Sequence, residues 1–171
     1  MKSRLGMPDL PERIVADLNL RRDSDVLVFG EPGEGVVERI AAAVDEPHRI
    51  VILYRGLSPP PWTRTFSERG VRVLRSHLYE HNDFLATSSF DSILAGNVLD
   101  KLMGKSEFLA ETYRLLKPGG RTALIEKLWP ASRLKKSDLL RLVERARSYS
   151  VVRREFSLMR AYIILERGLN G

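Results

Sequence analysis

The chain has 171 residues, of which 43% are hydrophobic and 29% are charged, and its formal net charge is +6. This length and composition predict a globular protein with a single domain over residues 1–171 and exclude a disordered chain. No run approaches the roughly 18 apolar residues of a membrane span. The first residues lack the apolar core of a secretory signal, and the absence of cysteine excludes disulfides and thiolate metal sites. We therefore expect a cytoplasmic protein that does not enter a membrane.

The balance of charged residues carries two weaker signals. Arginine outnumbers lysine 21 to 7 and glutamine is absent, which is typical of proteins from hot environments but also follows from GC-rich codon usage. Much of the positive charge falls within residues 132–156, and a basic excess favours anionic partners such as RNA. Aromatic residues do not alternate with the basic ones as a stacking surface would require. We therefore favour a solvated helix face and keep RNA as a candidate partner.

Short apolar runs alternate with helical patterns along the chain. In chain order, helices are predicted over residues 11–20, 35–46, 65–70, 106–116 and 135–149. Strands are predicted over residues 25–30, 49–56, 71–74, 90–96, 121–128, 151–156 and 161–167. Alternation favours a parallel sheet with helices on both faces, and the short connection between the last two strands requires an antiparallel pair. The fold class is therefore α/β: a Rossmann-like three-layer sandwich with a mostly parallel sheet of about seven strands, the last one antiparallel.

The first strand runs into a turn with three glycines, Gly30, Gly33 and Gly35, in the sequence VLVFGEPGEG. Open α/β sheets bind ligands beyond the carboxyl ends of their strands, and the following helix N-terminus favours anions. The spacing is not that of a phosphate-binding P-loop, because two valines follow the last glycine where lysine and serine or threonine belong. It also departs from the dinucleotide fingerprint G-x-G-x-x-G. A ligand site and a plain strand-to-helix turn both remain open.

A segment further along the chain carries a family resemblance. It contains Phe90-Asp91 at the start of a strand, then Val98-Leu99, and then Leu-Lys-Pro-Gly-Gly at residues 116–120. In this order, these elements resemble class I S-adenosylmethionine-dependent methyltransferases of the type 11 branch, and the resemblance extends over residues 18–167. It implies a Rossmann-like sheet with the last strand reversed, S-adenosylmethionine as cofactor, and transfer of a methyl group to an acceptor.

The resemblance also implies where the cofactor would bind. The family has an acidic residue in its first strand, where this chain has Val28, so Glu31 is the candidate replacement. The family's second acid, which holds the ribose hydroxyls, corresponds to Tyr54 and Arg55, and arginine cannot accept a hydrogen bond. The third acid, near the adenine amine, falls close to Ser76 and His77. The implied cofactor-binding residues are Gly30, Glu31, Gly33, Gly35, Tyr54, Arg55, Ser76, His77 and Asn97.

The packing motifs thus persist while the polar cofactor contacts differ, and three interpretations follow. In the first, the chain is a methyltransferase with altered cofactor contacts. In the second, it is an inactive relative that has lost the cofactor and acts as a binding or regulatory partner. In the third, its ligand site has changed to bind an anion. No catalytic motif is expected, because the sulfonium is already activated and catalysis is mostly positioning. Asn97 faces the substrate or caps its loop, and Trp129 lines a substrate pocket or packs in the core. The chain lacks an insertion that would cap the site, which suits a large acceptor or a pocket completed by a protein partner or a second copy.

Overall fold

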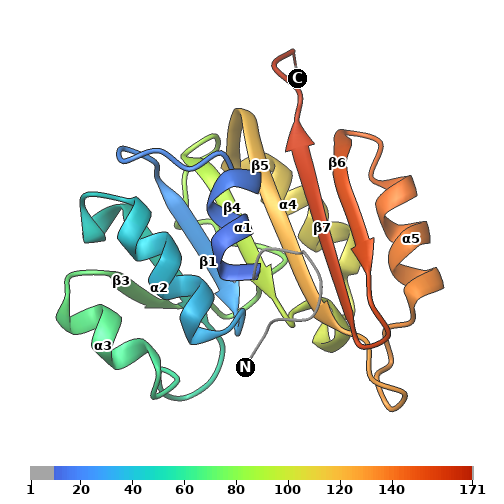
Figure 1. The fold of residues 1–171 in the computed structure, drawn as a ribbon, viewed down its shortest axis with the longest axis horizontal. Helices are drawn as coiled ribbons and strands as arrows, with labels where there is room; N and C mark the ends of the chain where they lie inside the picture. Colours follow the sequence, from blue (N-terminus) through green and yellow to red (C-terminus); the bar gives the residue numbers. More distant parts are fainter. Residues whose placement is uncertain (1–9, 171) are drawn as a thin grey trace, which may run out of the picture.

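A computed structural model describes residues 10–170 as one seven-stranded sheet with helices on both faces (Figure 1). The strands are β1 (Val26–Gly30), β2 (Ile50–Tyr54), β3 (Arg72–Arg75), β4 (Phe90–Gly96), β5 (Leu116–Lys127), β6 (Tyr149–Phe156) and β7 (Arg160–Arg167). The α-helices are α1 (Leu10–Asp17), α2 (Glu34–Ala43), α3 (Thr63–Glu68), α4 (Lys105–Leu115) and α5 (Lys136–Arg145). Two short 3₁₀ helices, η1 (Pro47–Arg49) and η2 (Leu99–Lys101), precede β2 and α4. Within residues 10–170, no helix is long and apolar enough to cross a membrane.

The strand order is β3-β2-β1-β4-β5-β7-β6, and β7 runs antiparallel to both of its neighbours. This confirms the predicted α/β class and the single reversed strand. β1 pairs with β2 on one side and with β4 on the other. The chain adds β2 and β3 on one side of β1 and then places β4 on the other side. The switch point in strand order therefore lies between β1 and β4, and open α/β sheets bind ligands at such a point.

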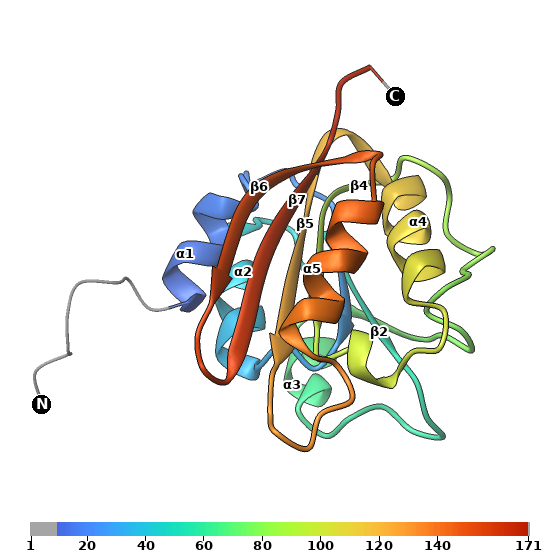
Figure 2. The same ribbon diagram turned by 90° about the vertical axis from the view of Figure 1, so that its right-hand side faces the viewer.

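Alternation along the strands divides the core between the two faces of the sheet. Leu27 and Phe29 of β1 pack with α4 and α5, whereas Val26 and Val28 pack with α1, α2 and α3. Figure 2 shows the same division, with α1 and α2 on one side of the sheet and α4 and α5 on the other. Because both faces are covered, the central strands are apolar at almost every position, as parallel strands require.

The Leu-Lys-Pro-Gly-Gly segment does more than end a helix. α4 ends at Leu115, and β5 begins at once at Leu116, earlier than the start at residue 121 that the sequence predicts. Lys117 Nζ lies 2.8 Å from Asp91 Oδ2 and 3.0 Å from Asp25 Oδ2. Burial acts to lower the pKa of Lys117, but the two carboxylates outweigh it and raise that pKa. This motif therefore fastens the amino-terminal edge of the sheet, opposite the edge where β1 and β4 end.

Candidate functional site

The chain turns sharply where β1 ends, at the carboxyl edge of the sheet. Gly30 has φ 73°, and a Cβ at this position would collide with the carbonyl oxygen of Gly96, the last residue of β4. The backbone N–H of Glu31 donates to the same carbonyl at 2.8 Å, and a Cβ at Gly96 would collide with Pro32. The two strand ends therefore meet with no room for a side chain at either glycine.

A cavity of about 470 Å³ opens beside this turn. Its walls come from the carboxyl ends of β1 and β2, from the loop after β2, and from the loop and η2 that follow β4. Five of the residues that the resemblance implies line it: Gly30, Glu31, Tyr54, Arg55 and Asn97. Further lining residues that the sequence did not single out include Pro60, Tyr79, Lys101 and Leu102. These residues all lie in segments that follow a strand, and the strand order is needed to tell which of these segments meet.

The later glycines do not line this cavity. Gly33 is the residue before α2, with φ 106°, and Gly35 lies in the first turn of that helix with no atom near an added Cβ. Pro32, between them and Gly30, packs against Gly96. The expectation that the whole glycine turn surrounds a ligand therefore reduces to Gly30 and Glu31.

Ser76 and His77 also lie outside the lining of the cavity. Ser76 is buried, and its hydroxyl is 2.7 Å from Asn82 Oδ1 and 3.0 Å from the Leu78 carbonyl oxygen. His77 is exposed. Asn82 in turn donates its backbone N–H to Glu111 of α4 at 2.9 Å. The polar groups of Ser76 and Asn82 therefore hold the segment after β3 against α4.

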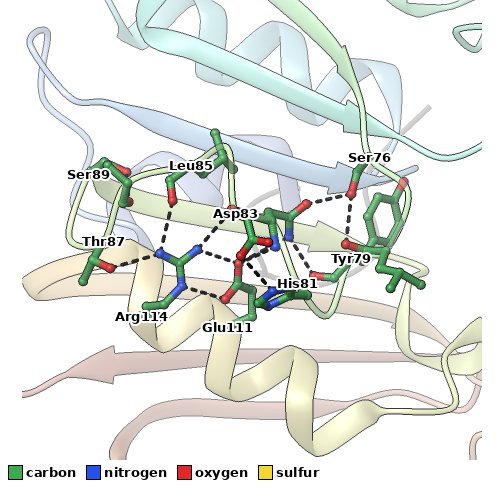
Figure 3. Close-up of polar contacts among 12 residues, drawn as sticks. Ser76, Tyr79, His81, Asp83, Leu85, Thr87, Ser89, Glu111 and Arg114 are labelled. Carbon is green, nitrogen blue, oxygen red and sulfur yellow. Dashed lines mark hydrogen bonds and ion pairs between the residues drawn. The ribbon is translucent and has the colours of Figure 1, made fainter.

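Figure 3 shows this polar network around Glu111 and Arg114. Arg114 donates to both carboxylate oxygens of Glu111 at 2.8 Å, and also to the carbonyl oxygens of Leu85 and Asn82. Burial acts to raise the pKa of Glu111, but the bonds from Arg114 and Asn82 outweigh it and lower that pKa. A buried ionised carboxylate with this many donors fixes the loop between β3 and β4 in one conformation.

Arg55 is positioned by an aromatic ring at the end of β2. Its guanidinium carbon lies 5.6 Å from the centroid of the Tyr79 ring, within the range of a cation–π contact. The Tyr79 hydroxyl donates to the Leu53 carbonyl oxygen at 3.2 Å, and burial raises the pKa of Tyr79. The cavity therefore contains the cations of Arg55 and Lys101 together with the carboxylate of Glu31.

Asn97 joins two of the loops that form the cavity. Its side-chain N–H donates to the Glu31 carbonyl oxygen at 2.9 Å, and its side-chain oxygen accepts from the Lys127 N–H at 2.9 Å. Its φ of 54° is in the left-handed region, where asparagine is tolerated better than most residues. The amide of Asn97 therefore ties the loop after β1 and the last residue of β5 to the end of β4.

A second cavity of about 260 Å³ lies next to the first and shares Glu31, Asn97 and Lys101 with it. Glu126, near the end of β5, also lines this cavity and is only 1% exposed. Its Oε1 accepts the backbone N–H groups of Val98 and Leu99, each at 3.0 Å, whereas within residues 10–170 its Oε2 has no hydrogen-bond partner. Burial raises the pKa of Glu126 to about 7, and the nearby charge of Asp100 acts in the same direction.

The two tryptophans differ in their positions. Trp62 packs edge-on against Phe66 at a centroid distance of 5.9 Å and belongs to the core on the α2 face. Trp129 is 50% exposed and lines the second cavity directly after β5. Sequence reasoning identified Trp129 as a candidate but missed Glu126, whose one available signal is an acid within the apolar run LIEKL.

Part of the chain matches a known family, and the fold resembles that of solved structures. Residues 62–124 match the family described as a methyltransferase domain. No curated protein sequence matches the chain. Among solved structures, the chain is similar to the YcgJ protein from Bacillus subtilis (TM-score 0.70, 13% identity, covering 94% of this chain and 98% of that one).

Two other similar structures show what the fold can carry. One is a 1,6-didemethyltoxoflavin N1-methyltransferase from Burkholderia thailandensis with bound S-adenosylhomocysteine (TM-score 0.66, 17% identity, covering 92% of this chain and 76% of that one). The other is the [4+2]-cyclase SpnF (TM-score 0.74, 16% identity, covering 94% of this chain and 80% of that one). Likeness at these identities concerns the fold, and one fold hosts several chemistries. Residues 62–124 thus resemble a methyltransferase domain, and the whole described chain has the fold of these structures.

Proposed function

We propose that this protein binds S-adenosylmethionine in the 470 Å³ cavity and transfers its methyl group to an acceptor. The observation that carries the proposal is the position of this cavity, at the switch point between β1 and β4, beside the side-chain-free turn at Gly30. The family match over residues 62–124 supports the same activity.

The charges in the cavity fit the groups of the cofactor. S-adenosylmethionine carries an ammonium and a sulfonium, for which Glu31 supplies a carboxylate, and a carboxylate, for which Lys101 supplies a cation. When bound, the cofactor provides an activated methyl group, so the protein's contribution is to hold the acceptor in line with it. Pro60 and Tyr79 provide apolar and aromatic surface for a base.

A second candidate function has its own supporting observation. Arg55, where the family has an acid, cannot accept hydrogen bonds from ribose hydroxyls, and it is held against the Tyr79 ring. This favours a methyltransferase-fold protein that has lost the cofactor and acts as a binding or regulatory partner.

The test that separates the two functions is calorimetric titration with S-adenosylmethionine and S-adenosylhomocysteine. We expect binding by the unaltered protein, and about ten-fold tighter binding by Arg55→Glu, because a carboxylate restores a charge-assisted acceptor for the hydroxyls. Arg141→Glu makes the same charge change on the exposed side of α5 and serves as the control. Absence of heat and of a thermal shift with both proteins at millimolar cofactor would contradict the proposal. Binding by Arg55→Glu alone would support the cofactor-free function.

The dimensions of the second cavity bear on the acceptor. Its volume of about 260 Å³ suits a small molecule or a single side chain or base. Part of the positive charge that favours RNA is balanced within the protein, because Arg153 pairs with Asp17 and Glu155. We therefore propose a small acceptor group, and an acceptor in RNA would have to present one base to this cavity.

A further inference from the structure

Glu126, which has one unpartnered carboxylate oxygen, lines the cavity in which a methyl acceptor would bind if the proposed function is correct. The cavity that Glu126 lines adjoins the first cavity through Glu31, Asn97 and Lys101. A group held in the second cavity would therefore face a methyl donor held in the first. Glu126 Oε2 is buried without a hydrogen-bond partner within residues 10–170, and an unsatisfied buried acceptor costs about 1–3 kcal/mol unless a ligand or water meets it.

Asp100, which also lines this cavity, differs from Glu126 in its hydrogen bonds. Asp100 Oδ1 accepts the Ser132 hydroxyl at 2.8 Å and the Leu134 N–H at 2.7 Å. The Ser132 hydroxyl, followed by the Leu134 N–H, lowers the pKa of Asp100. Asp100 is therefore a fastening for the loop that carries Trp129. The charged groups facing Glu126 across the cavity are Glu31, Asp100, Lys101 and Lys127.

Trp129 supplies the remaining wall. It follows β5 directly, is half exposed, and lies on a loop that the Asp100 bonds hold in place. An indole face of this kind offers stacking area to a planar group. The second cavity is thus lined by the aromatic side chain of Trp129 and by Glu126, whose buried Oε2 has no hydrogen-bond donor within residues 10–170.

We propose that the methyl acceptor is a small aromatic molecule or ring bearing an N–H or O–H nucleophile, which stacks on Trp129 and donates its proton to Glu126. This inference rests on the proposed function. In the step, the bond from the acceptor nitrogen or oxygen to the methyl carbon forms as the sulfur–methyl bond breaks, and the sulfur keeps the electron pair. The acceptor's proton passes to Glu126 Oε2 and is later lost to water. Glu126 is the catalytic base of this step.

The test uses phenol and toluene, two rings of similar size that differ in one donor. Binding is followed by ¹H–¹⁵N NMR shifts of the full chain, without S-adenosylmethionine. We expect phenol to bind about ten-fold more tightly than toluene, because the phenol hydroxyl can donate a hydrogen bond to the Glu126 carboxylate and toluene cannot. We also expect this preference to grow as pH rises through neutrality and Glu126 ionises.

Variants and a direct titration complete the experiment. In Glu126→Gln the preference for phenol and its pH dependence should disappear, whereas Glu144→Gln, on the exposed side of α5, should keep both. Carboxyl ¹³C NMR of the unaltered protein, independent of any variant, should show the Glu126 signal titrating near neutrality, with a pKa that falls on addition of phenol and not of toluene. Equal affinities for the two rings, or an unchanged Glu126 titration with phenol, would overturn the inference. Neither measurement depends on cofactor binding, so its failure is distinct from failure of the proposed function.

Discussion

The burial of the Glu126 carboxyl group should make the free energy of unfolding of the protein depend on pH. Its pKa of about 7 in the folded state is above the ordinary value of 4.5. Between these two pH values the folded state holds a proton that the unfolded state has lost. The contribution of Glu126 to the free energy of unfolding is therefore fully present below pH 4.5, falls as pH rises toward 7, and is constant above that.

We expect Glu126→Gln to reveal this contribution by difference. The glutamine keeps an oxygen for the Val98 and Leu99 N–H groups but cannot ionise. The free energy of unfolding of the variant, minus that of the unaltered protein, should therefore increase between pH 4.5 and pH 7 by an amount on the order of 3 kcal/mol. Urea unfolding at a series of pH values measures it, and a difference that does not change with pH would show that Glu126 titrates normally.

At the scale of elements, Lys117 illustrates a residue whose role lies in joining strands. It neutralises Asp91 of β4 and Asp25 before β1, and Asp91 also accepts the Asp25 N–H at 2.8 Å. Lys117→Met keeps the length of the side chain and leaves both carboxylates without their cation. We expect a loss of roughly 1–2 kcal/mol in the free energy of unfolding, measured in urea at pH 7.

Lys101→Met, at the opposite edge of the sheet, is the matched control and should leave stability nearly unchanged because Lys101 is exposed. Equal losses in the two variants would contradict the role assigned to Lys117.

At the scale of the whole molecule, the sequence predicts the sheet well and the site only in part. Apolar strands such as 26–29 and 50–53 are recognisable because they are buried on both faces, and the short connection between β6 and β7 requires antiparallel pairing. These features depend on local pattern. The start of β5 at Leu116 was missed because its pairing with Phe90 is a contact between distant segments.

Ser76 and Glu126 have contacts that spacing along the chain does not reveal. Ser76 has the right distance from β3 to meet a nucleotide, but Asn82 and Glu111 draw it into a network with α4. Glu126 sits in an apolar strand, where its partners come from the loop after β4. Spacing along the chain cannot reveal such partners, because they are set by which strands become neighbours.

The strand order also leaves β6 as one margin of the sheet, and no strand of residues 10–170 pairs with its outer side. Val151 and Val152 of this strand are 43% and 46% exposed. Exposed apolar residues on such a strand favour pairing with a strand of another molecule. Arg153 of the same strand is paired with Asp17 and Glu155, and Arg154 is exposed. Charged side chains along an exposed margin disfavour pairing with a second sheet, so we expect Arg154 to oppose edge-to-edge aggregation.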